Sequence, residues 1–180
     1  MHKVFITGSS IICALGNNKK ESINKLKYIN NKNYKEYLKE NFEDINYYKI
    51  KQNFKTQKEK FFSILEKTIL DAINDAKLSK EDRENLNIYL SSTSMNISLI
   101  EESFSTTNSI HAITFEEISN FVENIISSKY PCVFIQTACT SSANAIIKAS
   151  NEIKNEDIQK AIIIGFEFFN EISENIGSSG

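Results

Sequence analysis

Residues 131–150 read PCVFIQTACTSSANAIIKAS, and this stretch decides the fold. Residues 132–137 are mostly apolar, with the β-branched and aromatic side chains that are typical of a buried strand. The run leads almost directly to Cys139, and the residues that follow are mainly Ser and Ala. Such small side chains let a helix approach its neighbours closely. We therefore predict a strand, a cysteine at the join, and a helix buried on most sides.

The predicted position of Cys139 suits a nucleophile. The first backbone N–H groups of a helix have no partner within the helix, and together with the helix dipole they stabilise an anion. A cysteine there is expected to have a lowered pKa and a larger thiolate fraction. The same N–H groups can stabilise an oxyanion on an acyl group carried by the sulfur. Cys139 is thus the candidate catalytic residue.

The alternative is that Cys139 is a small buried hydrophobic residue, since unpaired cysteines are often found inside proteins. Cys13 and Cys132 are assigned that role. Cys132 lies in or just before the predicted strand, and Cys13 lies in a turn with apolar neighbours. Neither is predicted to lie at a helix terminus.

The rest of the chain predicts an α/β fold with a mostly parallel sheet and helices on both faces. Further strands are predicted at residues 3–8, 85–94 and 160–166, and helices at 56–77 and 114–128. Thr114 and Glu117 have the spacing of a capping box. The buried stripe of that second helix is predicted to comprise Phe115, Ile118, Phe121, Val122, Ile125 and Ile126. Strands separated by helices favour right-handed parallel crossovers.

The composition limits the classes of function that are expected. The 180 residues carry 21 basic and 23 acidic side chains, for a net charge of -2, without the basic stripe that nucleic-acid binding requires. The Lys- and Asn-rich run at 17–41 is interpreted as a solvated surface, and the Lys-, Asn- and Tyr-rich segment 28–60 has no functional account. We expect one domain over residues 1–180, with 171–180 as a loop or tail.

The three cysteines also bear on the compartment. An odd number without C-x-x-C spacing predicts neither a disulfide framework nor a metal site, and it favours a reducing cytoplasm. No segment approaches the roughly 18 unbroken apolar residues of a membrane span, and no leader is expected.

Four motifs in order resemble the β-ketoacyl-acyl carrier protein synthases, condensing enzymes of fatty acid and polyketide biosynthesis with the thiolase fold. QTACTSSANAI at 136–146 is similar to the nucleophile segment of that family. VFITGSSIICALGNN at 4–18 resembles its opening strand and turn, although Ser10, Cys13 and Ala14 depart from the pattern. AINDAKLS at 72–79 and KAIIIGFEFF at 160–169 complete the set. In the last motif Gly165 and Glu167 match, and Phe166 or its neighbour displaces a glycine.

The resemblance implies that Cys139 accepts an acyl group from a carrier-protein thioester. A carbanion formed by decarboxylation of a malonyl thioester would then attack that acyl group. It implies no cofactor. The expected partners are acyl carrier protein thioesters and either a homodimer or a complementing ketosynthase-like chain.

The other catalytic groups of the family do not carry over. The family's two histidines and lysine come from a C-terminal half, in a chain over twice this length. His2 and His111 match neither histidine motif and are interpreted as ordinary surface residues. The resemblance also implies a strand at 160–166 beside the strand at 3–8, and a fifth strand that this chain lacks.

Three hypotheses therefore remain open. The first is the N-terminal part of a ketosynthase that is not competent alone. The second is a catalytically silent ketosynthase-like subunit, or a truncated remnant, that acts through a partner. The third is an unrelated cysteine hydrolase, which would require His111 near Cys139.

Overall fold

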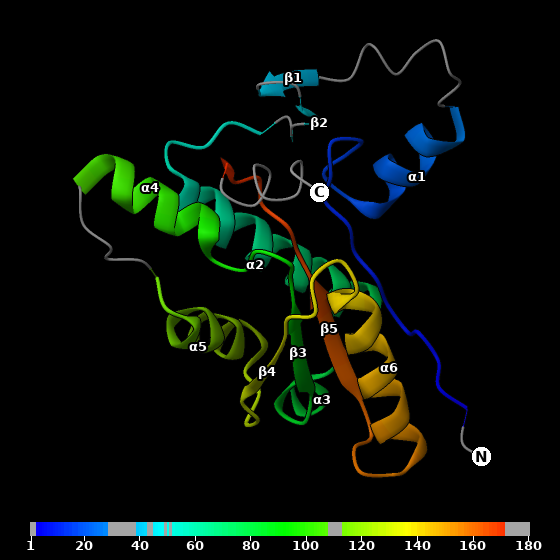
Figure 1. The fold of residues 1–180 in the computed structure, drawn as a ribbon. Helices are drawn as coiled ribbons and strands as arrows, with labels where there is room; N and C mark the ends of the chain where they lie inside the picture. Colours follow the sequence, from blue (N-terminus) through cyan, green and yellow to red (C-terminus); the bar gives the residue numbers. More distant parts are fainter. Residues whose placement is uncertain are drawn as a thin grey trace. The chain divides into compact units, whose positions relative to one another are not determined.

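A computed structural model describes residues 3–28, 39–42, 45–48, 50, 52–107 and 113–171. The chain divides into two compact units, one of residues 7–77 and one of residues 1–6 with 78–180. Figure 1 shows the helices and strands along the chain.

The unit of residues 7–77 contains α1 (Lys19–Tyr28), an antiparallel hairpin of β1 (Lys39–Phe42) and β2 (Ile45–Tyr48), and α2 (Gln57–Asp75). Helix α2 begins where the Thr56 side chain accepts a hydrogen bond from Glu59 N. It confirms the helix predicted at 56–77. Its buried side chains lie at helical spacing: Phe61, Ile64, Leu65, Ile69 and Ile73.

The other unit is built on three parallel strands, β3 (Asn87–Ser91), β4 (Cys132–Ile135) and β5 (Ala161–Gly165), in the order β4-β3-β5. The connecting helices are α4 (Ile97–Thr107), α5 (Phe115–Ile126) and α6 (Ser141–Lys154), and a short helix α3 (Lys80–Glu84) precedes β3. Parallel strands joined by helices are the predicted arrangement, and the α/β class is confirmed.

Helices lie against both faces of this sheet. On one face, Tyr89 of β3 packs with Ala145 and Ala149 of α6. Phe134 of β4 pairs with Leu90, one position along from Tyr89, so it belongs to the opposite face. There its ring stacks on Phe115 of α5 at a centroid distance of 5.2 Å. The sheet is therefore covered by α6 on one side and by α5 on the other.

Helix α5 confirms the predicted capping box, because the Thr114 side chain accepts from Glu117 N and the Glu117 side chain accepts from Thr114 N. Its buried residues are Ile118, Val122 and Ile126. The prediction that Phe115 is buried is wrong, since 38% of this residue is exposed. Phe115 is the first residue of the helix, where only one side of its ring meets the sheet.

The strand predicted at residues 3–8 is also wrong. The structure shows no strand at residues 3–8. The strand predicted at 160–166 is β5, which pairs with β3 along all five of its residues, and in the described part of the chain no strand pairs with its other edge. Phe5 and Ile6 are 74% and 90% exposed, and an apolar strand without a sheet partner or a buried face gains little from its β propensity.

Within the unit of residues 7–77, other contacts hold the continuation of this segment. Ser9 N donates to Asp75 Oδ2 at 2.9 Å, and Lys19 Nζ pairs with the same carboxylate. A Cβ on Gly8 would lie 2.5 Å from Ala76 N, so only glycine permits this approach to the end of α2. Residues 8 and 9 are thus fixed by α2 and not by a strand ladder.

Candidate active site

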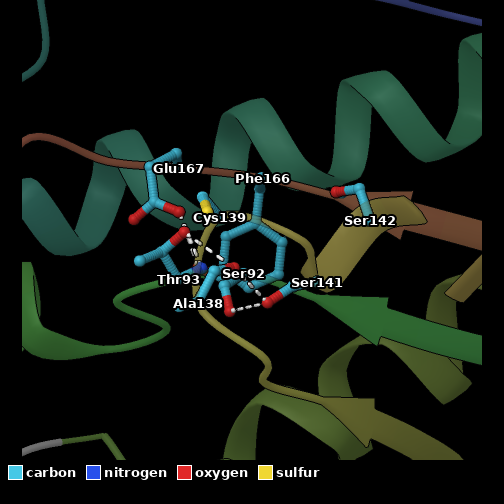
Figure 2. A pocket seen from close by; sticks show the side chains of 9 residues that line it. Ser92, Thr93, Ala138, Cys139, Ser141, Ser142, Phe166 and Glu167 are labelled. Atoms are coloured by element: carbon cyan, nitrogen blue, oxygen red, sulfur yellow. Dashed lines mark hydrogen bonds between the residues drawn. The ribbon is translucent and has the colours of Figure 1, made fainter. Parts of the chain in front are cut away.

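The candidate site is a pocket where the carboxyl ends of the three parallel strands meet. It has a volume of about 260 Å³ and is lined by Ser92, Thr93, Ala138, Cys139, Ser141, Ser142, Gly165, Phe166 and Glu167. These residues come from the turn after β3, the turn between β4 and α6, the first residues of α6, and the end of β5 with the residues that follow it. In open parallel sheets, ligands bind outside the carboxyl ends of the strands. Figure 2 shows the lining side chains.

Cys139 lies in the turn between β4 and α6, and it is exposed. The helix begins at Ser141, and the side chain of Thr140 makes no capping hydrogen bond to it. Thr140 Oγ1 instead donates to Thr137 O at 2.6 Å. The N-terminus of α6 therefore retains backbone donors without a side-chain cap, close to the cysteine.

The turn that carries Cys139 has an unusual backbone. Ala138, immediately before the cysteine, has a φ of 52°, in the left-handed region that residues with a Cβ rarely adopt. Its carbonyl oxygen accepts from Ser141 N at 3.1 Å and from Ser141 Oγ at 2.6 Å. Strain of this kind persists only where surrounding contacts hold it, and it is concentrated at functional sites.

Glu167 joins the site from the end of β5. Its carboxylate accepts hydrogen bonds from Thr93 N at 2.8 Å and from Ser94 N at 3.1 Å. It also accepts from the hydroxyls of Ser92 and Ser94. Figure 2 shows Glu167, Thr93 and Cys139 grouped in one part of the pocket.

The other cysteines have different surroundings. Cys132 N donates to Glu123 Oε1 at 2.9 Å, and its sulfur donates to Ser119 O at 3.8 Å. Burial, as the largest cause, raises the pKa of the Cys132 thiol to about 12. Cys13 Sγ lies 3.6 Å from Ser22 Oγ in the other unit. All three cysteines are free thiols.

Both histidines lie outside the described residues, so the distance between His111 and Cys139 is not tested and the hydrolase hypothesis stays a prediction. Within the described part of the chain, no helix is long and apolar enough to cross a membrane.

A family model described as "Beta-ketoacyl synthase, N-terminal domain" matches residues 29–174 of the chain. The chain belongs to this family. The matched residues include Cys139, Gly165 and Glu167, but not the opening segment 4–18, which is also where the predicted strand is absent. No curated protein sequence matches the chain.

Solved structures include similar folds. One is a ketosynthase (ApeO) in complex with its chain length factor (ApeC) from Xenorhabdus doucetiae, with 16% identity and a TM-score of 0.62. The match covers 99% of this chain and 52% of that one, so this chain spans about half its length. Another is the oxazolomycin ketosynthase domain OzmH KS7 of Streptomyces albus JA3453, with 18% identity and a TM-score of 0.49, covering 66% of this chain and 22% of that one.

The sequence indicated only part of this site. It predicted Cys139 at a strand-to-helix join, and Gly165 and Glu167 were noted only as matches to a motif. The strand predicted at 85–94 ends at Ser91 in the structure, and the role of residues 92–94 was not predicted, because their partner Glu167 lies more than 70 positions away in sequence. A run of hydroxyl residues directly after a buried strand was the available signal.

Proposed function

We propose that this chain is the nucleophile-bearing N-terminal part of a β-ketoacyl synthase, with Cys139 as the acyl acceptor. The observation that carries the proposal is the exposed Cys139 in the pocket at the carboxyl ends of β3, β4 and β5, next to the uncapped N-terminus of α6. Membership of the family supports the reaction class. We further propose that residues 1–180 form one incomplete ketosynthase domain, with 171–180 as its tail.

In the first step, the thiolate of Cys139 attacks the carbonyl carbon of an acyl thioester on a carrier protein. The bond between that carbon and the carrier sulfur breaks, and the carrier leaves as a thiol after taking a proton. Backbone N–H groups at the start of α6 suit the negative charge that develops on the carbonyl oxygen.

In the second step, a malonyl thioester loses carbon dioxide, and the resulting carbanion attacks the acyl carbon. The bond from that carbon to Cys139 Sγ breaks and the thiol is regenerated. Decarboxylation needs groups that stabilise the carbanion, and the described residues that line the pocket include neither histidine nor lysine. We therefore propose that this step depends on residues outside the pocket described here, in a completing segment or a partner chain.

The proposed donors are thioesters of an acyl carrier protein, in fatty acid or polyketide biosynthesis, and the proposed compartment is the cytoplasm, where a free thiol stays reduced. A second candidate function is a silent subunit that acts through a partner ketosynthase. The solved ketosynthase that is bound to a chain length factor favours it, since that protein works in a complex.

The test is acylation by a short acyl thioester of N-acetylcysteamine, followed by intact mass. We expect the unsubstituted chain to gain one acyl group, the Cys139→Ala variant to gain none, and the matched Cys132→Ala control to gain one. A silent subunit would show no adduct on the unsubstituted chain. An adduct that survives in Cys139→Ala would also contradict the assignment.

A further inference from the structure

Glu167 is the charged side chain among the residues that line the pocket, and its carboxylate is bound entirely to the turn after β3. The four donors are two backbone N–H groups, of Thr93 and Ser94, and two hydroxyls, of Ser92 and Ser94. An ionised carboxylate suits this arrangement because it accepts hydrogen bonds at both oxygens and donates none. Glu167 thereby ties the end of β5 to residues 92–94.

The same turn contacts the backbone next to Cys139. Thr93 Oγ1 donates to the carbonyl oxygen of Ala138 at 3.3 Å. Ser92 O accepts from Ser141 Oγ at 3.1 Å, on the other side of the cysteine. The left-handed Ala138 is therefore held partly by groups whose own position depends on Glu167.

We propose that Glu167 is a positioning residue for the nucleophile: through Thr93 and the Ala138 carbonyl it fixes the orientation of Cys139 toward a bound thioester. This inference rests on the proposed function of Cys139. Glu167 reaches the cysteine turn through residues 92–94, so its role is to raise the share of productive orientations and not to take part in bond making.

Replacing Glu167 by Gln tests this role with little change of shape. A glutamine offers one acceptor oxygen, and its NH₂ group faces donors of the turn, so part of the hydrogen bonding between residue 167 and residues 92–94 is lost. Thr93→Val is the second variant: it keeps Glu167 and removes only the hydroxyl that reaches Ala138 O. Glu116→Gln is the matched control, because this exposed glutamate on α5 loses the same charge away from the pocket.

The measurement is the rate of acyl-Cys139 formation over a range of acyl N-acetylcysteamine concentrations. Because Glu167 and Thr93 are exposed and water replaces some of their lost hydrogen bonds, we expect a loss of about 3- to 10-fold in the limiting rate for Glu167→Gln and Thr93→Val, with little change in the half-saturating concentration. The double variant should be little slower than the slower single variant. Both changes interrupt the same chain of contacts, from Glu167 through Thr93 to the Ala138 carbonyl. Glu116→Gln should match the unsubstituted chain.

Alkylation by iodoacetamide separates positioning from loss of structure. The reagent is small and needs no bound orientation, so alkylation of Cys139 should change less than about 2-fold in both variants. Cys132 should stay protected, as its burial requires. If Cys132 is alkylated in Glu167→Gln, that variant has lost its fold. The limiting rate of Thr93→Val then decides whether the inference stands.

An unchanged limiting rate in a folded Glu167→Gln variant would overturn the inference and leave the proposed function standing. Additive losses in the double variant would also overturn it, since two independent effects would then be at work. No acylation of the unsubstituted chain is a different result: it would refute the proposed function, and this inference with it.

Discussion

Cys132 and Cys139 lie at opposite ends of β4 and have opposite surroundings. Cys132 faces α5, where Glu123 and Ser119 bind its N–H and its sulfur. The negative charge of Glu123 adds to burial in raising the pKa of this thiol. Cys139 is exposed in the pocket beyond the strand. The fold therefore separates a protected thiol from an accessible one within a single β4–α6 segment.

Limiting iodoacetamide at pH 8 should label Cys139 well before Cys132, because a thiol with a pKa of about 12 is almost entirely protonated at that pH. Site-resolved mass spectrometry measures the order. Labelling of Cys132 at an equal rate in the folded chain would contradict the arrangement described here.

The same pKa shift links stability to pH. Folding raises the Cys132 pKa above the ordinary value of 9.0. The neutral thiol therefore makes its full contribution to the free energy of unfolding below about pH 9. This contribution is lost as the pH rises toward 12. In a Cys132→Ala variant, the free energy of unfolding, measured with urea, should fall less between pH 9 and pH 12 than in the unsubstituted chain. The same pH dependence in both proteins would contradict this prediction.

For single residues, the sequence predicts the position of a side chain where that position depends on residues nearby in the chain. The join between strand and helix placed Cys139 in a turn, since both flanking patterns are contiguous in sequence. The hydrogen bonds of Glu167 were not predictable from the sequence. The four donors at residues 92–94 reach its carboxylate only when β3 and β5 pair. The exposure of Phe115 depended equally on which side of α5 meets β4.

Among the elements, α6 and the end of β5 approach closely at Gly165. A Cβ there would lie 2.6 Å from Ser142 Oγ. That hydroxyl lies 3.2 Å from Ser91 Oγ, within hydrogen-bond distance. The missing side chain thus lets a polar contact form between β3 and α6 beside the pocket.

Gly165→Ala should lower the free energy of unfolding by about 1 kcal/mol, because Ser142 must rotate and leave Ser91. In a Ser142→Ala background the same substitution should cost less, since no hydroxyl remains to be displaced. Urea denaturation of the four proteins gives both values. Equal costs in the two backgrounds would show that the close approach to Ser142 is not the cause.

Element prediction succeeded for α2, whose apolar residues recur at helical spacing, and for α5, where this periodicity agrees with the capping box at Thr114. It failed for residues 3–8, which have strand propensity but form no strand, although the outer edge of β5 has no partner in the described part of the chain. β propensity describes a fit to neighbouring strands, so the sequence of one segment does not decide the pairing. The β1–β2 hairpin lies in the segment 28–60 for which the sequence offered no account.

At the scale of the whole molecule, the unit that carries the site has surfaces suited to association. In the described part of the chain β4 and β5 are the outer strands of the sheet. Ile146 and Ile147 of α6 are 52% and 56% exposed, so the prediction that this helix is buried on most sides is wrong. Unpaired strand edges and exposed apolar side chains favour pairing with another chain.

We therefore expect the chain to self-associate at micromolar concentration, or to bind a complementing ketosynthase-like chain. Ile147→Lys should weaken the association, whereas Lys20→Ala on α1 serves as an exposed control. Sedimentation velocity measures it. A well-folded monomer that binds no hydrophobic dye would contradict this expectation.

The measurement that most directly tests the central claim is one reaction of the chain with an acyl and a malonyl thioester, analysed by mass spectrometry for both protein and products. We expect an acyl group mapped to Cys139 without a β-ketoacyl product, because Cys139 is the proposed nucleophile and the decarboxylating groups are proposed to come from elsewhere. Acylation at Cys13 or Cys132, an unmodified Cys139, or measurable β-ketoacyl product from this chain alone would contradict it.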